Sequence, residues 1–138
     1  MTNAGPYKQA GGRLWRLIGN DWKEVSALAF EPMSLCSAPD GELWLVGGEA
    51  PRVFTIPPGG VAPVEVLQPV TSPSAVHCAP GGGVWIGGVE LLALHEAGSF
   101  AGVIGSIGAI HVIASSADDS LWVGGEGGLF VGRRAEVR

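Results

Sequence analysis

The chain has few charged residues, and the basic ones are the scarcest. Asp, Glu, Lys and Arg make up 15% of its 138 residues, against about 25% in typical globular domains. An amphipathic surface helix needs a polar face, so this composition disfavours a helical protein. Eight Lys and Arg stand against 13 Asp and Glu, which gives a net charge of −5. Nucleic-acid-binding domains present a basic surface, and we therefore expect no nucleic-acid partner.

Long hydrophobic runs are also missing. The most apolar segment, residues 100–114, is interrupted by Gly102, Gly105 and Gly108, and it is shorter than the roughly 20 apolar residues of a membrane-spanning helix. The N-terminus has no basic region followed by an apolar stretch, as a signal peptide would. We expect no membrane partner and a cytoplasmic location.

Cysteine occurs only twice. Cys36 lies eight residues before Trp44, and Cys78 lies seven residues before Trp85. In corresponding strands, this offset of one residue places the two side chains on opposite faces. The sequence therefore predicts two buried, reduced thiols, in keeping with a reducing compartment.

Common enzyme motifs are absent too. The sequence contains no Gly-x-x-x-x-Gly-Lys loop, no Gly-x-Ser-x-Gly elbow and no His-Glu-x-x-His helix. Nothing in the sequence alone assembles a nucleophile, a base and an oxyanion donor. We expect no cofactor, no metal and no catalytic residue.

What the chain does contain is a segment repeated three times. Ala-Pro-Asp-Gly-Glu-Leu-Trp-Leu-Val-Gly-Gly at 38–48 recurs as Ala-Pro-Gly-Gly-Gly-Val-Trp-Ile-Gly-Gly at 79–88 and as Ser-Ala-Asp-Asp-Ser-Leu-Trp-Val-Gly-Gly at 116–125. A spacing of about 40 residues between copies indicates a repeat architecture.

Each copy belongs to a longer unit of short strands. An apolar first strand precedes a tight turn, whose Asp-Gly or Gly-Gly supplies the positive φ of a hairpin. The tryptophan strand follows and ends in a glycine pair. The first strands are expected at 33–36, 75–78 and 110–114, the third strands at 52–56, 90–95 and 128–131, and the fourth strands at 63–67 and 102–104. Four short antiparallel strands in about 40 residues are typical of one β-propeller blade.

The fold expected is all-β, a β-propeller or partial propeller of about 3–4 four-stranded blades. A single repeat domain, 1–138, would contain a half blade at 7–30, blades at 31–70 and 71–108, and a last blade at 109–138. Trp44, Trp85 and Trp122 are predicted to fill the gaps between stacked blades. The glycine pairs would let neighbouring backbone approach closely.

The pattern Asp-Gly-x-Leu-Trp-x-x-Gly-Gly, followed by a strand such as Gly128-Leu129-Phe130, resembles the two-component regulator propeller repeat. It is also similar to the repeat of the streptogramin lyase propellers. The resemblance covers about residues 33–132 and implies a propeller fold. It does not select a function, because propellers serve as binding scaffolds, sensors and enzymes. Propellers of this type usually carry many more blades in one chain.

So few blades in an open arc would leave two apolar faces uncovered. A second copy could complete the ring, the chain could close on itself as a four-bladed disk, or a different partner could cover the faces. The homodimer is favoured, since both ends of the chain fall part-way through a blade and could exchange strands.

Three acidic residues follow the glycine pairs: Glu49, Glu90 and Glu126. Equivalent links of a propeller gather on one face, where three carboxylates could bind a cation or a basic ligand. Alternatively, they are ordinary solvated turn residues. Cys36 and His77 occupy equivalent places in successive first strands, where buried side chains are favoured over a metal site. His95 and His111 are interpreted as ordinary strand residues.

The function predicted is a non-catalytic binding or assembly module that completes a ring by homo-oligomerisation and holds a protein or small-molecule ligand on one face. The alternative is a lyase or hydrolase of the streptogramin lyase type, with a base and a metal on one propeller face. Binding is favoured because every histidine falls within a predicted strand, whereas the carboxylates lie in loops.

Overall fold

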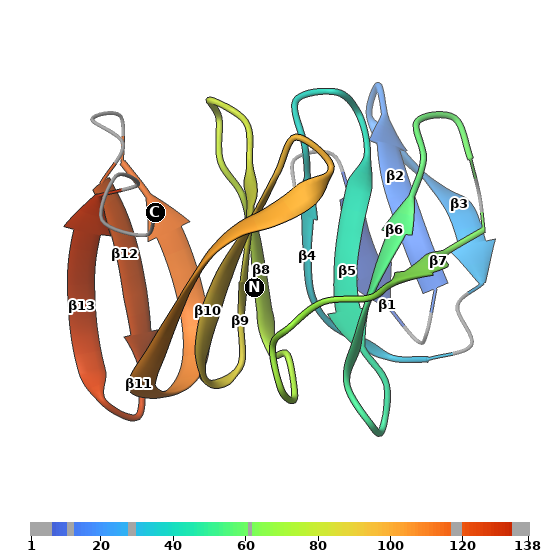
Figure 1. Ribbon diagram of the computed structural model, residues 1–138. Coiled ribbons are helices and arrows are strands. Elements are labelled where there is room, and N and C mark those ends of the chain that lie inside the picture. The colour runs from blue at the N-terminus through green and yellow to red at the C-terminus, as the bar shows by residue number, and fades with distance from the viewer. Residues whose placement is uncertain (1–6, 11–12, 28–29, 61, 117–119, 134–138) are drawn as a thin grey trace.

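The computed structural model describes residues 7–10, 13–27, 30–60, 62–116 and 120–133, and the regular structure there is entirely β-strand (Figure 1). The all-β prediction is confirmed. No helix among these residues is long and apolar enough to cross a membrane. The strands are β1 (Tyr7–Ala10), β2 (Arg13–Ile18), β3 (Asp21–Ala27), β4 (Pro32–Ser37), β5 (Leu43–Gly47), β6 (Arg52–Ile56), β7 (Val64–Val66), β8 (Ala75–Cys78), β9 (Val84–Gly87), β10 (Val89–Glu96), β11 (Ser99–Ser115), β12 (Ser120–Gly125) and β13 (Gly128–Arg133).

The strands form antiparallel meanders in chain order. We call β1–β3 the N-terminal sheet and β4–β7 the second sheet. The remaining strands, β8–β13, are connected by hydrogen bonds through the long strand β11. Residues 99–105 of β11, together with Ala109, lie in the ladder with β10, and residues 110–115 lie in the ladder with β12. We therefore distinguish a third sheet, β8–β10 with the first part of β11, from a last sheet, the second part of β11 with β12 and β13.

Figure 1 shows β11 crossing diagonally from the third sheet to the last one. Gly108 lies in the crossing, with φ of +77°, a conformation that favours glycine. The strand therefore serves as the outer strand of one sheet and the innermost strand of the next. The boundary predicted between residues 108 and 109 falls inside this strand.

The N-terminal sheet has one strand more than the sequence indicates. The half blade predicted at 7–30 corresponds to two of the four strands of a blade, and β2 and β3 lie in this region. Tyr7–Ala10 adds β1, which pairs antiparallel with β2 from Tyr7↔Arg16 to Ala10↔Arg13. Residues 117–119, in the third copy of the repeated segment, and residues 134–138, at the end of the predicted last blade, lie outside the described residues.

The sheets stack face to face and form an open arc. In Figure 1 the N-terminal sheet lies at one side and β12 and β13 lie at the other. Three apolar layers fill the spaces between successive sheets. Leu14 meets Leu43 and Leu45 in the first layer, Trp44 meets Val84 and Ile86 in the second, and Trp85 meets Leu121 and Val123 in the third. Burial of apolar faces between neighbours is what stabilises such a repeat.

Glycines have two separate roles in the repeat. Gly41 and Gly82 have φ of +91° and +98°, as the turn pattern predicts. At the end of the tryptophan strand the requirement is space. A Cβ on Gly47 would lie 2.4 Å from the Glu31 carbonyl oxygen, and one on Gly125 would lie 1.9 Å from the Ala109 carbonyl oxygen. The backbone of the preceding strand therefore occupies the place of a side chain.

The prediction of two reduced thiols is wrong, since Cys36 and Cys78 form a disulfide that joins β4 to β8. Their Cα atoms are 5.6 Å apart. Cys36 pairs with Trp44 in its ladder, whereas Cys78 pairs with Val84. The two cysteines thus lie on opposite faces of their own sheets, as the offset of one residue indicates.

In a stack of sheets, however, the two faces that contact each other point in opposite directions. The face of the second sheet that carries Trp44 packs against the face of the third sheet that carries Val84. The offset therefore brings the two sulfur atoms together. Disulfides persist mainly in oxidising compartments. This bond removes the thiol argument for a cytoplasmic location, which stays a prediction.

Candidate functional site

The innermost strands of successive sheets are joined by side-chain hydrogen bonds. Ser34 Oγ on β4 accepts a hydrogen bond from the Val76 backbone N at 3.1 Å and donates one to the Val76 carbonyl oxygen at 3.4 Å. Ser74 Oγ donates to the Ile110 carbonyl oxygen. His77 Nε2 lies 2.8 Å from Ser115 Oγ on β11. Cys36 and His77, which the repeat places at equivalent positions, thus each form a link between neighbouring sheets. Cys36 forms a disulfide, and His77 forms a hydrogen bond.

Stability should depend on pH through His77. Burial lowers the pKa of His77 below the ordinary value of 6.5. The unfolded chain therefore takes up the proton first, and acid favours unfolding. We expect the melting temperature to begin falling as the pH drops below about 6.5, the ordinary histidine value, and to fall further at lower pH.

The matched variant is His77→Gln, which keeps a polar side chain opposite Ser115 and does not titrate. Its melting temperature should fall less than that of the wild type over the same pH range. An identical pH profile for the two proteins would contradict this role of His77.

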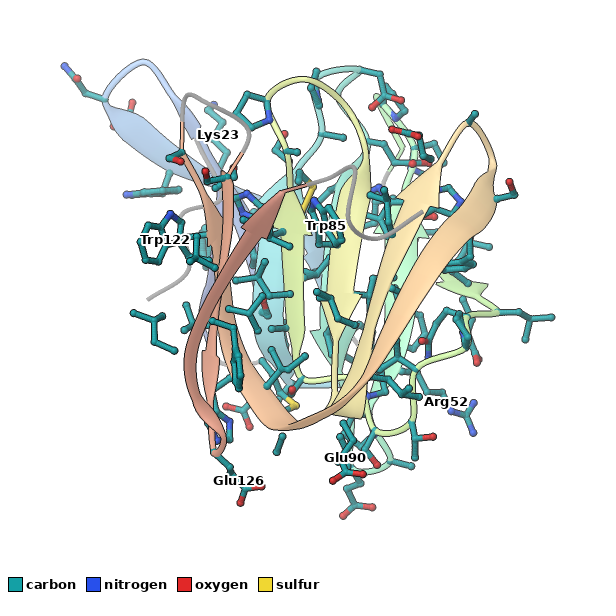
Figure 2. The ribbon with its side chains drawn as sticks, turned by 60° about the vertical axis from the view of Figure 1, so that its left-hand side comes forward. Lys23, Arg52, Trp85, Glu90, Trp122 and Glu126 are labelled. Atoms are coloured by element: carbon teal, nitrogen blue, oxygen red, sulfur yellow. A yellow bond between two sulfur atoms is a disulfide. The ribbon has the colours of Figure 1, made fainter. Side chains whose placement is uncertain are left out.

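The three predicted carboxylates lie at the ends of the tryptophan strands. Glu49 follows β5, Glu90 lies near the start of β10, and Glu126 lies in the turn between β12 and β13; all three are exposed. Figure 2 shows Glu90 and Glu126 projecting from the same end of the sheets. Each belongs to a different sheet. Among the described residues, no three His, Cys, Asp or Glu side chains are grouped so as to hold a metal ion.

Two of these glutamates have particular local surroundings. Glu126 Oε1 accepts from the backbone N of Ala109 at 3.4 Å. Glu49 lines a hollow of about 620 Å³ with Glu31 and Met33, and Met33 is exposed. The face that carries the glutamates is therefore acidic at Glu31 and Glu49, with an apolar side chain beside them.

A larger cleft lies between the second and third sheets, at the opposite end of the strands. Its volume is about 650 Å³. The lining comes from the turn between β4 and β5, the turn between β8 and β9, and the tip of the hairpin between β10 and β11. Asp40, Glu42 and Glu96 contribute carboxylates, and the described lining includes neither lysine nor arginine. The cleft is therefore electronegative, as is suitable for a cation or a basic group.

His95 lies in the wall of this cleft. Its ring centroid is 4.9 Å from that of Trp44 and 5.1 Å from that of Phe100. Burial lowers the pKa of His95, and the nearby charge of Glu42 acts in the opposite direction. No local pattern in the sequence indicates this cleft, because its walls come from turns of two different repeats and from a hairpin tip.

The three repeat tryptophans are not equally covered. Trp44 is 2% exposed and Trp85 is 3% exposed, and each is packed against the sheet that follows it. Trp122 is 41% exposed. In Figure 2, Trp85 lies among the sheets, whereas Trp122 stands at the edge of the molecule. No further sheet follows it among the described residues.

Solved structures show the class of fold. A structure described as YCF48 bound to D1 peptide superimposes with a TM-score of 0.67 at 18% identity, covering 88% of this chain and 43% of the other. Virginiamycin B lyase from Staphylococcus aureus superimposes with a TM-score of 0.61 at 16% identity, covering 88% and 48%. No protein-family model and no curated protein matches the sequence.

The chain therefore has a β-propeller fold, and its open arc of sheets is a partial propeller. The predicted resemblance to streptogramin lyase propellers is confirmed at the level of the fold. The chain spans less than half the length of either matched structure. At these identities the similarity shows the fold alone.

Proposed function

We propose that this chain is a β-propeller binding module that completes its ring with a second copy of itself. The observation that carries the proposal is the open arc: within the part of the chain that the structure describes, the N-terminal sheet and the last sheet each have a neighbouring sheet on one side only. Apolar sheet faces are stable when a neighbour covers them. A symmetric pair of identical chains is the commonest way to supply one.

The size of the arc supports a pair of chains. The residues that the structure describes form four stacked sheets per chain when β11 is divided between two of them. Two copies would supply eight, within the roughly four to eight blades of known propellers. Since one copy covers 43% and 48% of the two matched structures, two copies are about the size of one such propeller.

The test is the mass in solution, measured by light scattering after size exclusion across a dilution series. We expect twice the 14.1 kDa of the chain, unchanged on moderate dilution. A stable monomer would contradict ring completion by a second copy and would instead fit self-closure or a different partner.

The ligand-binding role of Glu49, Glu90 and Glu126 is part of the same proposal. Exposed carboxylates on one end of the sheets would attract a cation or a basic segment of a partner. A peptide is a suitable kind of ligand, because the matched YCF48 structure is described as bound to one.

Replacement of all three glutamates by glutamine separates binding from folding. All three side chains are exposed, so we expect the free energy of unfolding to change by less than about 0.5 kcal/mol. A tetralysine peptide serves as the probe for a basic segment: the rise that it causes in the melting temperature of the wild type should disappear in the triple variant. If the rise persists in the variant, these carboxylates are not the ligands.

A further inference from the structure

We propose that the outward face of the last sheet is a docking surface for the outward face of the N-terminal sheet of a second copy. This inference rests on the proposed ring and names the two surfaces that would close it. The first surface, the terminal face, consists of Val112, Trp122, Leu129 and Val131. The second, the initial face, consists of Trp15, Trp22 and Glu24.

The terminal face is defined by strand register. Trp122 pairs with Val131, and Gly124 pairs with both Val112 and Leu129, so these side chains share one side of the sheet. The alternate residues Leu121 and Val123 point the other way, into the layer shared with the third sheet. Val112, Leu129 and Val131 are each more than half exposed. A contiguous exposed apolar surface of this kind marks an interaction site.

Continuity with the interfaces inside the chain identifies the occupant. At the equivalent positions, Trp44 and Trp85 are covered by the aliphatic face of the following sheet. The terminal face repeats the same arrangement a third time, with Trp122 in place of Trp85. The surface that fits it is therefore the face of another sheet of this kind.

A second copy offers such a sheet at its N-terminal end. Leu14 is fully buried against the second sheet, so the next residue, Trp15, lies on the outward side of β2. Trp15 pairs with Glu24, and Trp22 lies two residues from Glu24 on the same side of β3. Trp22 is 39% exposed. Aromatic residues are enriched in the central, energetically important parts of protein interfaces.

The contact is head-to-tail, and it closes only when two arcs form a ring. Each chain then contributes its terminal face to one junction and its initial face to the other, so the two junctions are identical by symmetry. If the arcs did not close, the same contact would generate longer chains. The ring form therefore predicts a dimer and no larger species.

Single charged substitutions test the two faces separately. Trp122→Asp and Trp22→Asp should each convert the wild-type dimer to a species near 14.1 kDa, because each variant lacks one partner of both junctions. Leu67→Asp is the matched control, since Leu67 is 89% exposed and lies outside both faces. It should keep the wild-type mass. Circular dichroism establishes that each variant remains folded.

Mixing the two variants is the decisive step. Trp122→Asp retains an intact initial face, and Trp22→Asp retains an intact terminal face, so an equimolar mixture should restore a dimer through one intact junction. If Trp22→Asp alone stays dimeric while Trp122→Asp does not, the terminal face binds its own copy and the pairing is overturned.

The other possible masses separate a failure of the assigned faces from a failure of the homodimer itself. A dimeric wild type whose mass neither substitution changes overturns the assignment of these faces and leaves the homodimer standing. A monomeric wild type overturns both the homodimer and this inference. Oligomers larger than two overturn the closed ring.

Discussion

Trp85→Ala is expected to lower the free energy of unfolding by about 3–5 kcal/mol, the usual cost of truncating a buried tryptophan. Trp85 is 3% exposed and lies in the layer between the third and last sheets, beside Leu94, Ile110 and Leu121. Alanine would leave a cavity in a layer that two sheets share. Neighbouring sheets stabilise each other, so the loss would weaken both.

The measurement is denaturant unfolding followed by circular dichroism. Leu67→Ala is the control, because Leu67 is 89% exposed, and its replacement should change stability by less than about 0.5 kcal/mol. A change below about 1 kcal/mol for Trp85→Ala, far under the range for buried aromatic truncation, would contradict inter-sheet burial of this residue.

Removal of the Cys36–Cys78 disulfide should have an effect of similar size. The bond closes a loop with a sequence separation of 42 residues, for which the chain-entropy model gives about 4 kcal/mol. It also joins the innermost strands of the second and third sheets, beside the layer that contains Trp44. We therefore expect the double variant Cys36→Ser/Cys78→Ser to unfold at clearly lower denaturant concentration than the oxidised protein.

Reduction of the wild-type protein provides an independent comparison. Dithiothreitol should lower the melting temperature of the wild type and leave that of the double variant unchanged. Alkylation followed by mass measurement establishes how many thiols are free under each condition. Two free thiols in the protein purified without reductant would contradict the disulfide.

The sequence predicted the fold well because the repeat signals are local. A turn with Asp-Gly or Gly-Gly, a tryptophan strand and a glycine pair follow one another within about ten residues, so short-range patterning is sufficient to place the strands. Gly41 and Gly82 adopt the positive φ that the turns require. The strands predicted at 52–56 and 75–78 coincide with β6 and β8.

The errors and omissions concern relations between repeats. An alignment of Cys36 with Cys78 treats their two sheets as superimposed, so that side chains on opposite faces point away from each other. In the folded chain the two sheets stack face to face. The offset of one residue therefore led to the prediction of two separate thiols, although the stacked sheets bring the two cysteines together as a disulfide. The cleft around His95 was missed for a related reason, since its walls come from turns and a hairpin tip far apart in the sequence.

The candidate sites were predicted less completely than the fold. The sequence singled out Glu49, Glu90 and Glu126 by their position after the glycine pairs, and the structure leaves all three exposed on separate sheets. It did not indicate that Asp40, Glu42 and Glu96 line one cleft. Nor did it reveal the exposure of Trp122, because that depends on whether another sheet follows the last one.

The central claim is that this chain is part of a propeller ring that a second copy completes, and small-angle X-ray scattering tests it most directly. The account predicts a particle of twice the chain mass whose pair-distance distribution matches a flat, closed ring with a central channel. A distribution that matches a single open arc, with the mass of one chain, would contradict it.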